Sequence, residues 1–337
     1  MQRLILGNKD ISTSLRMDGK YIDVAWPIYT SSIDIEYLVV GGGGSGGTSR
    51  REGGFNFNAA GGGGAAGSVS TGSFILQTVD AAPDPFTINV NVGIAGPKEE
   101  YNESESRVGL GNRGVVSYVG FNFYQALGAA GCGGGGYNTY DRPGLPIGGA
   151  SGLNQSGDAL TGSFANFFEG GYSGFYDNDA GGGAGASQIG GDGLQGQFDT
   201  NATGGAGGAG VNVTNWYWNS SLDVVGVIAG GGGGSAYDTP SPVAGVGSSG
   251  GGNGATGTNP AGNATSFGSG GGGSHKADSG AGADGLVVLR YENRFQINDS
   301  GDDVFQVGDY WYHSFYASAS FTPQYTFERP EKIIIDI

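Results

Sequence analysis

The sequence predicts an all-β and irregular fold with essentially no α-helix, built around a glycine-rich central domain. Three observations predict it. Glycine accounts for 74 of the 337 residues, in short runs that alternate with polar and aromatic segments. Apolar residues do not recur at helical spacing over any useful window. Short apolar stretches of strand length bracket and interrupt the glycine runs.

Glycine runs favour disorder by composition alone, because glycine buries no side chain and loses the most backbone entropy on folding. Aromatic residues nevertheless make up 11% of the chain, whereas disordered chains are poor in aromatics. We therefore predict an ordered glycine structure. Flexible linkers between small strands are the alternative.

Composition divides the chain into three regions. Residues 1–34 are mixed and contain an alternating stretch at 21–26, which predicts a small N-terminal β segment for attachment or assembly. Residues 35–292 form the glycine-rich domain. Residues 293–337 lose the glycine runs and become aromatic and β-prone, which predicts a C-terminal aromatic β module.

Two apolar strands are expected to bracket the glycine-rich domain, at 35–40 and 285–291. Further strands are expected at 74–76 and 224–228 inside the domain. Residues 86–93 alternate apolar and polar side chains at a period of two, as a half-buried strand does.

The glycine runs predict a lattice of polyglycine II-like helices. Such a helix has three residues per turn, rises about 3.1 Å per residue and makes no internal hydrogen bonds. Because buried backbone groups must be paired, several helices must lie side by side, and only Gly with occasional Ala or Ser lets them approach. The spacing of the runs is irregular, unlike the Gly-X-Y repeat of collagen. The runs lie at 41–47, 61–67, 128–136, 181–185, 204–210, 230–234, 250–257 and 268–273.

The charge and the cysteine content exclude several kinds of partner. The net charge of −16 disfavours nucleic acid and anionic membrane surfaces, which need Lys and Arg. The single cysteine, Cys132, allows no intrachain disulfide and no cysteine-based metal site. No apolar run is long enough to span a membrane, so we expect no membrane insertion. Since no signal peptide is evident, we expect synthesis in a cytoplasm.

Glycine-based catalytic motifs arise easily by chance in such a chain. Residues 41–46 match a dinucleotide-binding fingerprint, but no helix is expected after them to hold a pyrophosphate. Residues 43–47 match a nucleophile elbow, which needs a histidine. His275 is expected in a solvated turn and His313 in an aromatic cluster. We therefore expect no catalytic residues, no enzymatic activity and no cofactor.

Acidic turns at 177–179 and 298–303 carry oxygen ligands that calcium accepts. A single calcium-type nonapeptide at 280–286 lacks the tandem copies that such sites share. Because acidic turns are usually only turns, we expect no metal site.

The segments between the glycine runs are rich in aromatic and amide side chains, which recognition surfaces use. If the glycine helices form a rigid slab, the connecting loops gather at its ends and present a binding surface. The alternative is that these aromatics cap the lattice or pack between subunits. The candidate receptor-binding residues are Phe167, Phe168, Tyr172, Phe175, Tyr176, Trp216, Tyr217 and Trp218.

Residues 35–291 resemble the glycine-rich domain of bacteriophage tail-fibre and adhesin proteins. The resemblance rests on an opening Glu-Tyr-Leu-Val-Val strand that runs into glycine, a Thr-Ile-x-Val-x-Val-Gly strand and a closing Gly-Leu-Val-Val-Leu-Arg-Tyr strand. It implies a non-enzymatic protein of a virion appendage, with polyglycine II helices and receptor-binding loops at one end. The matching segments are 36–44, 61–67, 87–93, 229–234 and 282–291.

The resulting hypothesis is a tail fibre or adhesin that binds a host surface glycan or outer-membrane protein through aromatic loops. Expected partners are other tail or fibre proteins and further copies of the chain, with a trimer as the usual state of a fibre. The protein would be assembled in the host cytoplasm and exposed on the released particle. The alternatives are a structural virion protein without receptor binding, such as a head fibre, decoration or tail connector, and an extracellular glycine-rich matrix protein.

Overall fold

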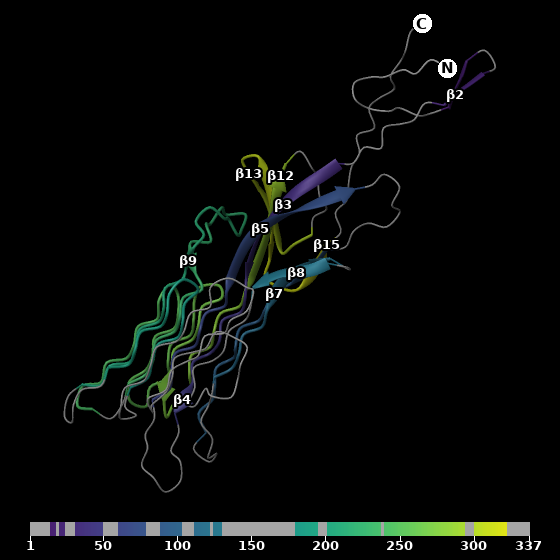
Figure 1. The fold of residues 1–337 in the computed structure, drawn as a ribbon. Coiled ribbons are helices and arrows are strands. Elements are labelled where there is room, and N and C mark those ends of the chain that lie inside the picture. The colour runs from purple at the N-terminus through teal and green to yellow at the C-terminus, as the bar shows by residue number, and fades with distance from the viewer. Residues whose placement is uncertain are drawn as a thin grey trace.

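The computed structural model shows an elongated molecule with β-sheets at one end and a bundle of extended glycine segments at the other (Figure 1). No helix occurs in the part of the chain that the structure describes, which confirms the all-β and irregular class. The described residues are 14–17, 20–23, 31–49, 60–78, 88–102, 111–121, 124–129, 179–194, 201–236, 239–293 and 300–321.

The larger sheet has five antiparallel strands in the order β13-β14-β12-β3-β5. It confirms the two predicted bracketing strands, which pair with each other in register from Leu286 opposite Val40 to Arg290 opposite Glu36. The C-terminal strands extend the same sheet, so the sheet crosses the composition boundary at residue 292. The strands are β3 (Ser31–Val40), β5 (Val69–Thr78), β12 (Leu286–Glu292), β13 (Asp303–Val307) and β14 (Tyr310–Phe315).

The smaller sheet has four antiparallel strands in the order β15-β6-β7-β8. The predicted alternating strand forms its β6 and shows the expected pattern, with Ile88 and Val90 buried and Asn89 exposed. A register shift between β7 and β8 lies near Val119. The strands are β6 (Ile88–Asn91), β7 (Ser117–Phe121), β8 (Tyr124–Ala129) and β15 (Ala319–Phe321).

Among the described residues, three short strand pairs lie outside these sheets, and two of them are antiparallel. The third pair is parallel and joins two turns of the glycine region. The pairs are β1 (Ser14–Met17) with β2 (Lys20–Asp23), β9 (Val211–Asn212) with β10 (Val227–Ile228), and β4 (Thr48–Ser49) with β11 (Ser274–His275).

One face of the larger sheet packs against the smaller sheet, and together they form a sandwich. Alternate residues of β3, among them Ile33 and Ile35, meet Ile88 and Val90 of β6 in one buried cluster, while Asp34 between them is exposed. This alternation follows from the pleat of a strand, which sends successive side chains to opposite faces. Leu289 and Tyr291 of β12 and Phe315 of β14 complete the cluster.

The segment 211–229 covers the other face of the larger sheet. Its buried side chains Val213, Trp216 and Ile228 pack on Leu38 of β3 and Val288 of β12. The central strands are therefore buried on both faces toward their glycine-side ends, and this explains why residues 37–40 are all buried instead of alternating.

Strands of both sheets continue directly into the extended glycine segments, which form the lattice in Figure 1. Both conformations are extended, so the chain passes from one to the other without a turn. Two segments leave the sheets, 41–47 after β3 and 92–96 after β6. Three others lead into strands, namely 60–68 before β5, 111–116 before β7 and 279–285 before β12.

Hydrogen bonding in the lattice repeats every three residues. Each N–H of run 41–47 donates to one of three neighbouring segments in strict rotation, with N···O distances of 2.9–3.0 Å. A helix with three residues per turn points successive amides about 120° apart, which is the polyglycine II arrangement. The donors are Gly41, Gly44 and Gly47 to run 60–68, Gly42 and Ser45 to segment 111–116, and Gly43 and Gly46 to segment 279–285.

Run 229–236 shows the same rotation. Its amides from Gly231 to Ala236 donate in turn to segment 202–210, run 60–68 and segment 250–256, and then repeat the order. Two separate runs therefore bond in three directions, and the lattice extends in two dimensions across the helices.

The purest glycine runs lie inside the lattice. Runs 41–47, 60–68, 228–236 and 268–275 are buried throughout. A Cβ atom added at Gly63 or Gly232 would lie closer than 3.0 Å to backbone atoms of a neighbouring run. Segments such as 243–248 lie at the rim, and there Val243 and Val246, one turn apart, are both exposed.

Candidate functional site

Three of the predicted contact residues lie on segment 211–229, which is called the cover of the larger sheet. Trp216 is only 4% exposed, and Tyr217 and Trp218 are partly buried in the same apolar cluster. The rings of Trp216 and Tyr217 meet the ring of Tyr312 edge-on, at centroid distances of 6.5 and 5.8 Å. These side chains anchor the cover to the sheet.

The other five predicted contact residues lie outside the described part of the chain. They are Phe167, Phe168, Tyr172, Phe175 and Tyr176.

Local turns position Trp216 above the sheet. The amide of Trp216 donates to the carbonyl of Val213, and its own carbonyl accepts from the amide of Val225. The segment thus folds back on itself and directs the indole towards β12. The spacing of residues in the sequence gives no sign of this return, because it is made by backbone hydrogen bonds that join Trp216 to Val213 on one side and to Val225 on the other.

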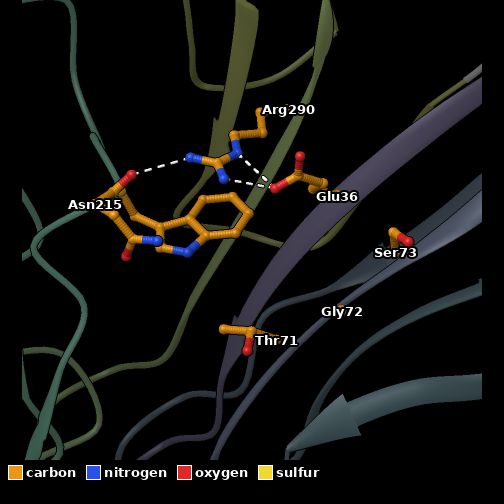
Figure 2. Close-up of a pocket in the computed structure, with 7 residues that line it drawn as sticks. Glu36, Thr71, Gly72, Ser73, Asn215 and Arg290 are labelled. Atoms are coloured by element: carbon orange, nitrogen blue, oxygen red, sulfur yellow. Dashed lines mark hydrogen bonds and ion pairs between the residues drawn. The ribbon is translucent and has the colours of Figure 1, made fainter.

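Arg290 of β12 organises the polar part of this face. Its Nε and Nη2 donate to Oε2 of Glu36 at 2.9 and 2.5 Å, and Nη1 donates to the carbonyl of Asn215 (Figure 2). Nη1 also donates to the hydroxyl of Tyr312. The guanidinium also lies over the Trp216 ring, 4.3 Å from its centroid. Burial lowers the pKa of Arg290, but the hydrogen bonds to Glu36 and Tyr312 outweigh it and raise that pKa overall.

A pocket of about 320 Å³ opens beside this ion pair. It lies where the cover meets the edge strand β5, so one wall is β5 and the opposite wall is the cover (Figure 2). Of the predicted contact residues that the structure describes, Trp216 lines this pocket, whereas the other lining residues were not predicted. A charged residue inside an otherwise apolar strand, as at Glu36 and Arg290, was the available signal. The lining residues are Glu36, Thr71, Gly72, Ser73, Asn215, Trp216 and Arg290.

A second aromatic cluster joins the cover to the end of β14. Trp218 meets Phe267 and Tyr316 edge-on at 5.3 and 5.9 Å, and the Tyr316 hydroxyl donates to the Trp218 carbonyl at 2.6 Å. Burial, together with the charges of Asp303 and Asp302, raises the pKa of Tyr316 to about 12.

The aspartates of the acidic turn at the start of β13 accept hydrogen bonds from backbone amides. Oδ2 of Asp302 accepts the amides of Tyr316 and Ala317, and Oδ2 of Asp303 accepts the amide of Ser220. Within the described ranges, no group of three or more His, Cys, Asp or Glu is placed to hold a metal ion. Asp177 and Asn178 of the other acidic turn lie outside those ranges.

The serine of the nucleophile-elbow motif and the two histidines of the chain are buried in the fold. The Ser45 hydroxyl accepts the amide of Asn112 and donates to the carbonyl of Gly46, inside the lattice. His313 is buried; its Nδ1 donates to the Ser300 carbonyl, so Nε2 accepts from the Tyr291 hydroxyl at 2.5 Å. His275 is also fully buried, and the prediction of a solvated turn at this residue was wrong.

The end of the lattice farthest from the sheets is called the lattice tip here. Lys98 and Asp278 form an ion pair there at 2.7 Å, and Asp278 also accepts the amide of Tyr101. The hydrogen bond from Lys98 is the main reason why the pKa of Asp278 is lowered. The described part of the tip comprises residues 48–49, 97–102, 192–194, 201–203, 239–243, 256–261 and 274–279.

A family model described as a glycine-rich domain matches residues 17–292. Because the match covers more than half of the chain, the chain belongs to this glycine-rich domain family. Among curated proteins, no match to the sequence was found. No helix in the described part of the chain is long and apolar enough to cross a membrane.

Proposed function

We propose that this protein is a component of a bacteriophage appendage, a tail fibre or adhesin, whose glycine lattice holds a receptor-binding surface away from its point of attachment. The observation that carries the proposal is the strict three-residue rotation of backbone hydrogen bonds in residues 41–47 and 231–236. Each interior helix is bonded to several others, so the lattice is a stiff spacer and not a flexible linker.

The directions in which the strands run through the sandwich support this role. Strand β3 enters the larger sheet at Ser31, opposite Thr78, and reaches the lattice only at Val40. In the smaller sheet, Phe321 lies opposite Ile88, whereas Asn91 leads into the lattice. Strand β3, the first of the sandwich in chain order, therefore begins at the end remote from the lattice tip, and β15, the last, ends there.

Turns from distant parts of the sequence gather at the lattice tip. Residues that flank the segments 50–59, 103–110 and 195–200 all lie there, because Ser49 pairs with His275, Tyr101 bonds to Asp278, and Leu194 pairs with Thr203. Loops held on a rigid scaffold are where binding functions concentrate. A host surface glycan or outer-membrane protein is the expected partner, with other virion proteins and further copies of the chain at the opposite end.

Binding of labelled full-length protein to candidate host bacteria tests the proposal. We expect saturable binding to one strain, which excess unlabelled protein abolishes. A variant with Phe167, Phe168, Tyr172 and Phe175 changed to Ala should lose this binding, whereas Val246→Ser on the side of the lattice should keep it. Absence of binding to every host of the parent particle would contradict the proposal.

A structural virion protein without a receptor is the second candidate function, and one observation favours it. Trp216, Tyr217 and Trp218, the described members of the predicted contact set, are packed against the sheet instead of standing free. If the protein only spaces or decorates a particle, the purified chain binds the particle but no cell. Pull-down on particles that lack the protein, measured beside the cell assay, separates the two functions.

A further inference from the structure

We infer that the pocket beside Arg290 is a binding site for one ring of a neutral sugar. The site lies on the sandwich and is separate from the lattice tip. Its volume of about 320 Å³ is at the lower end of the range of about 300–1,000 Å³ for small-molecule sites, which suits a single small ligand.

The pocket offers hydrogen-bonding groups that the fold leaves unused. The hydroxyls of Thr71 and Ser73 and the side-chain amide of Asn215 form no hydrogen bond with other described residues, and all three residues are exposed. The same holds for Oε1 of Glu36, since both bonds from Arg290 go to Oε2. Donors and acceptors thus converge from both walls, as a polyhydroxylated ring requires.

The charge of the pocket is balanced, which decides the class of ligand. Arg290 and Glu36 neutralise each other through two hydrogen bonds. A phosphate or carboxylate would have to compete with Glu36 for the guanidinium, and an ammonium group would have to compete with Arg290 for the carboxylate. The net charge of −16 further disfavours anions. A neutral ligand with many hydroxyls pays neither penalty.

The Arg290 side of the pocket is fixed before any ligand arrives. Arg290 is held at once by Glu36, the Asn215 carbonyl and the Tyr312 hydroxyl, and it lies over the Trp216 ring. These bonds tie the cover to the sheet on the side of the pocket. A preformed site loses less conformational entropy on binding, and this favours even a small ligand.

The inference is independent of the lattice tip. If the protein is an adhesin, the pocket gives it a second, weaker glycan contact near its attached end. If the protein is purely structural, the pocket binds sugar all the same.

Titration of the full-length protein with sugars, followed by the indole N–H signals in nitrogen–proton NMR spectra, tests the inference. The chain has four tryptophans, so four indole signals are expected, and Trp216→Phe identifies the one that lines the pocket. The probes are the methyl glycosides of glucose, galactose and mannose, and N-acetylglucosamine. We expect one of them to shift the Trp216 signal saturably, while glycerol at the same concentration does not.

Two variants change the walls of the pocket without touching the Arg290–Glu36 pair. Thr71→Val combined with Asn215→Leu should raise the Kd about 25-fold, from about fivefold for each lost hydrogen bond. Ser73→Tyr should fill the pocket and abolish the shift. Thr258→Val at the lattice tip is the matched control, because it removes the same hydroxyl from an exposed turn outside the pocket.

Three outcomes would overturn the inference. They are no saturable shift with any neutral sugar, an unchanged Kd in the double variant, and tighter binding of glucuronic acid or glucose 6-phosphate than of the neutral sugars. Cell binding without a sugar shift would reject the pocket and keep the adhesin. A sugar shift without cell binding would keep the pocket and reject the adhesin.

Discussion

The sandwich and the glycine lattice hold one chain together in opposite ways. In the sandwich, large side chains such as Ile35, Leu289 and Phe315 are completely buried between the sheets. In the lattice, most buried residues are glycines, which bring only backbone, and the small methyl groups of Ala65 and Ala184 form a cluster of their own.

Geometry explains this difference. A strand bonds to neighbours in two directions within one plane, so alternate side chains remain free to fill the space above and below. A polyglycine II helix bonds in three directions around its axis, which leaves little room in the interior for side chains larger than those of Ala and Ser. Rigid packing can therefore come mainly from backbone, provided that the sequence keeps large side chains out of the runs.

Inserting a side chain inside the lattice should break this arrangement most strongly. A Cβ at Gly63 would overlap backbone atoms of Gly232 and Gly183. We expect Gly63→Val to cost at least about 5 kcal/mol, comparable with the whole stability of a modest domain, and so to leave little folded protein. Soluble yield and circular dichroism measure this loss.

Ala65→Gly, two residues further along the same run, is the control for the lattice. Ala65 is fully buried but has room for its methyl group against Ala184. Removing this methyl should cost about 1 kcal/mol at most. Equal tolerance of Gly63→Val and Ala65→Gly would show that the lattice is not close-packed.

Truncating a core side chain should weaken the sandwich by a smaller amount. Leu289 is 1% exposed in the cluster between the sheets, so Leu289→Ala should lower the free energy of unfolding by about 2–5 kcal/mol. Chemical denaturation gives this value. Leu222→Ala, at a residue that is 48% exposed, should change it by less than about 0.5 kcal/mol.

Alkaline pH should destabilise the sandwich through deprotonation of Tyr316. Its pKa is raised from 10.0 to about 12 in the folded protein, so its neutral form stabilises the fold at pH values below 10. Between pH 10 and about 12 the unfolded chain binds fewer protons, and this stabilisation is progressively lost. Tyr316→Phe should remove one phenol that titrates at about pH 12 from the ultraviolet absorbance titration. An unchanged titration would refute the assignment.

Acid pH should act on the lattice tip, with the smallest effect of the four. The pKa of Asp278 lies below 3.8 in the folded protein, so its contribution is present above that pH and is lost as the pH falls through the lowered pKa. Asp278→Asn should speed hydrogen exchange at the Tyr101 amide, which bonds to this carboxylate, and leave the unfolding midpoint unchanged. Slower exchange, or a shifted midpoint, would contradict a purely local role.

Much of the fold could be predicted from the sequence, because its signals are local. The apolar stretches at 35–40 and 285–291 became β3 and β12, and the alternating stretch at 86–93 contains β6. The glycine runs predicted backbone pairing between segments, with flexible linkers as the alternative, and the structure shows the pairing.

The candidate site could not be predicted in the same way. The sequence grouped Trp216, Tyr217 and Trp218 as contact residues, but the return of the chain between Val213 and Val225 turns them onto the sheet. Glu36 and Arg290 are 254 residues apart in sequence and meet only because β3 pairs with β12.

By itself, the sequence determined that the chain is all-β and irregular, and it predicted that the glycine runs pack backbone against backbone. The tertiary structure alone decided which run lies beside which, and hence where the pocket and the lattice tip are. The physical reason is that a glycine run carries no side chain to identify its neighbour. Its position is set instead by the strands that continue from it and by the turns that return the chain, such as 256–261 and 274–279.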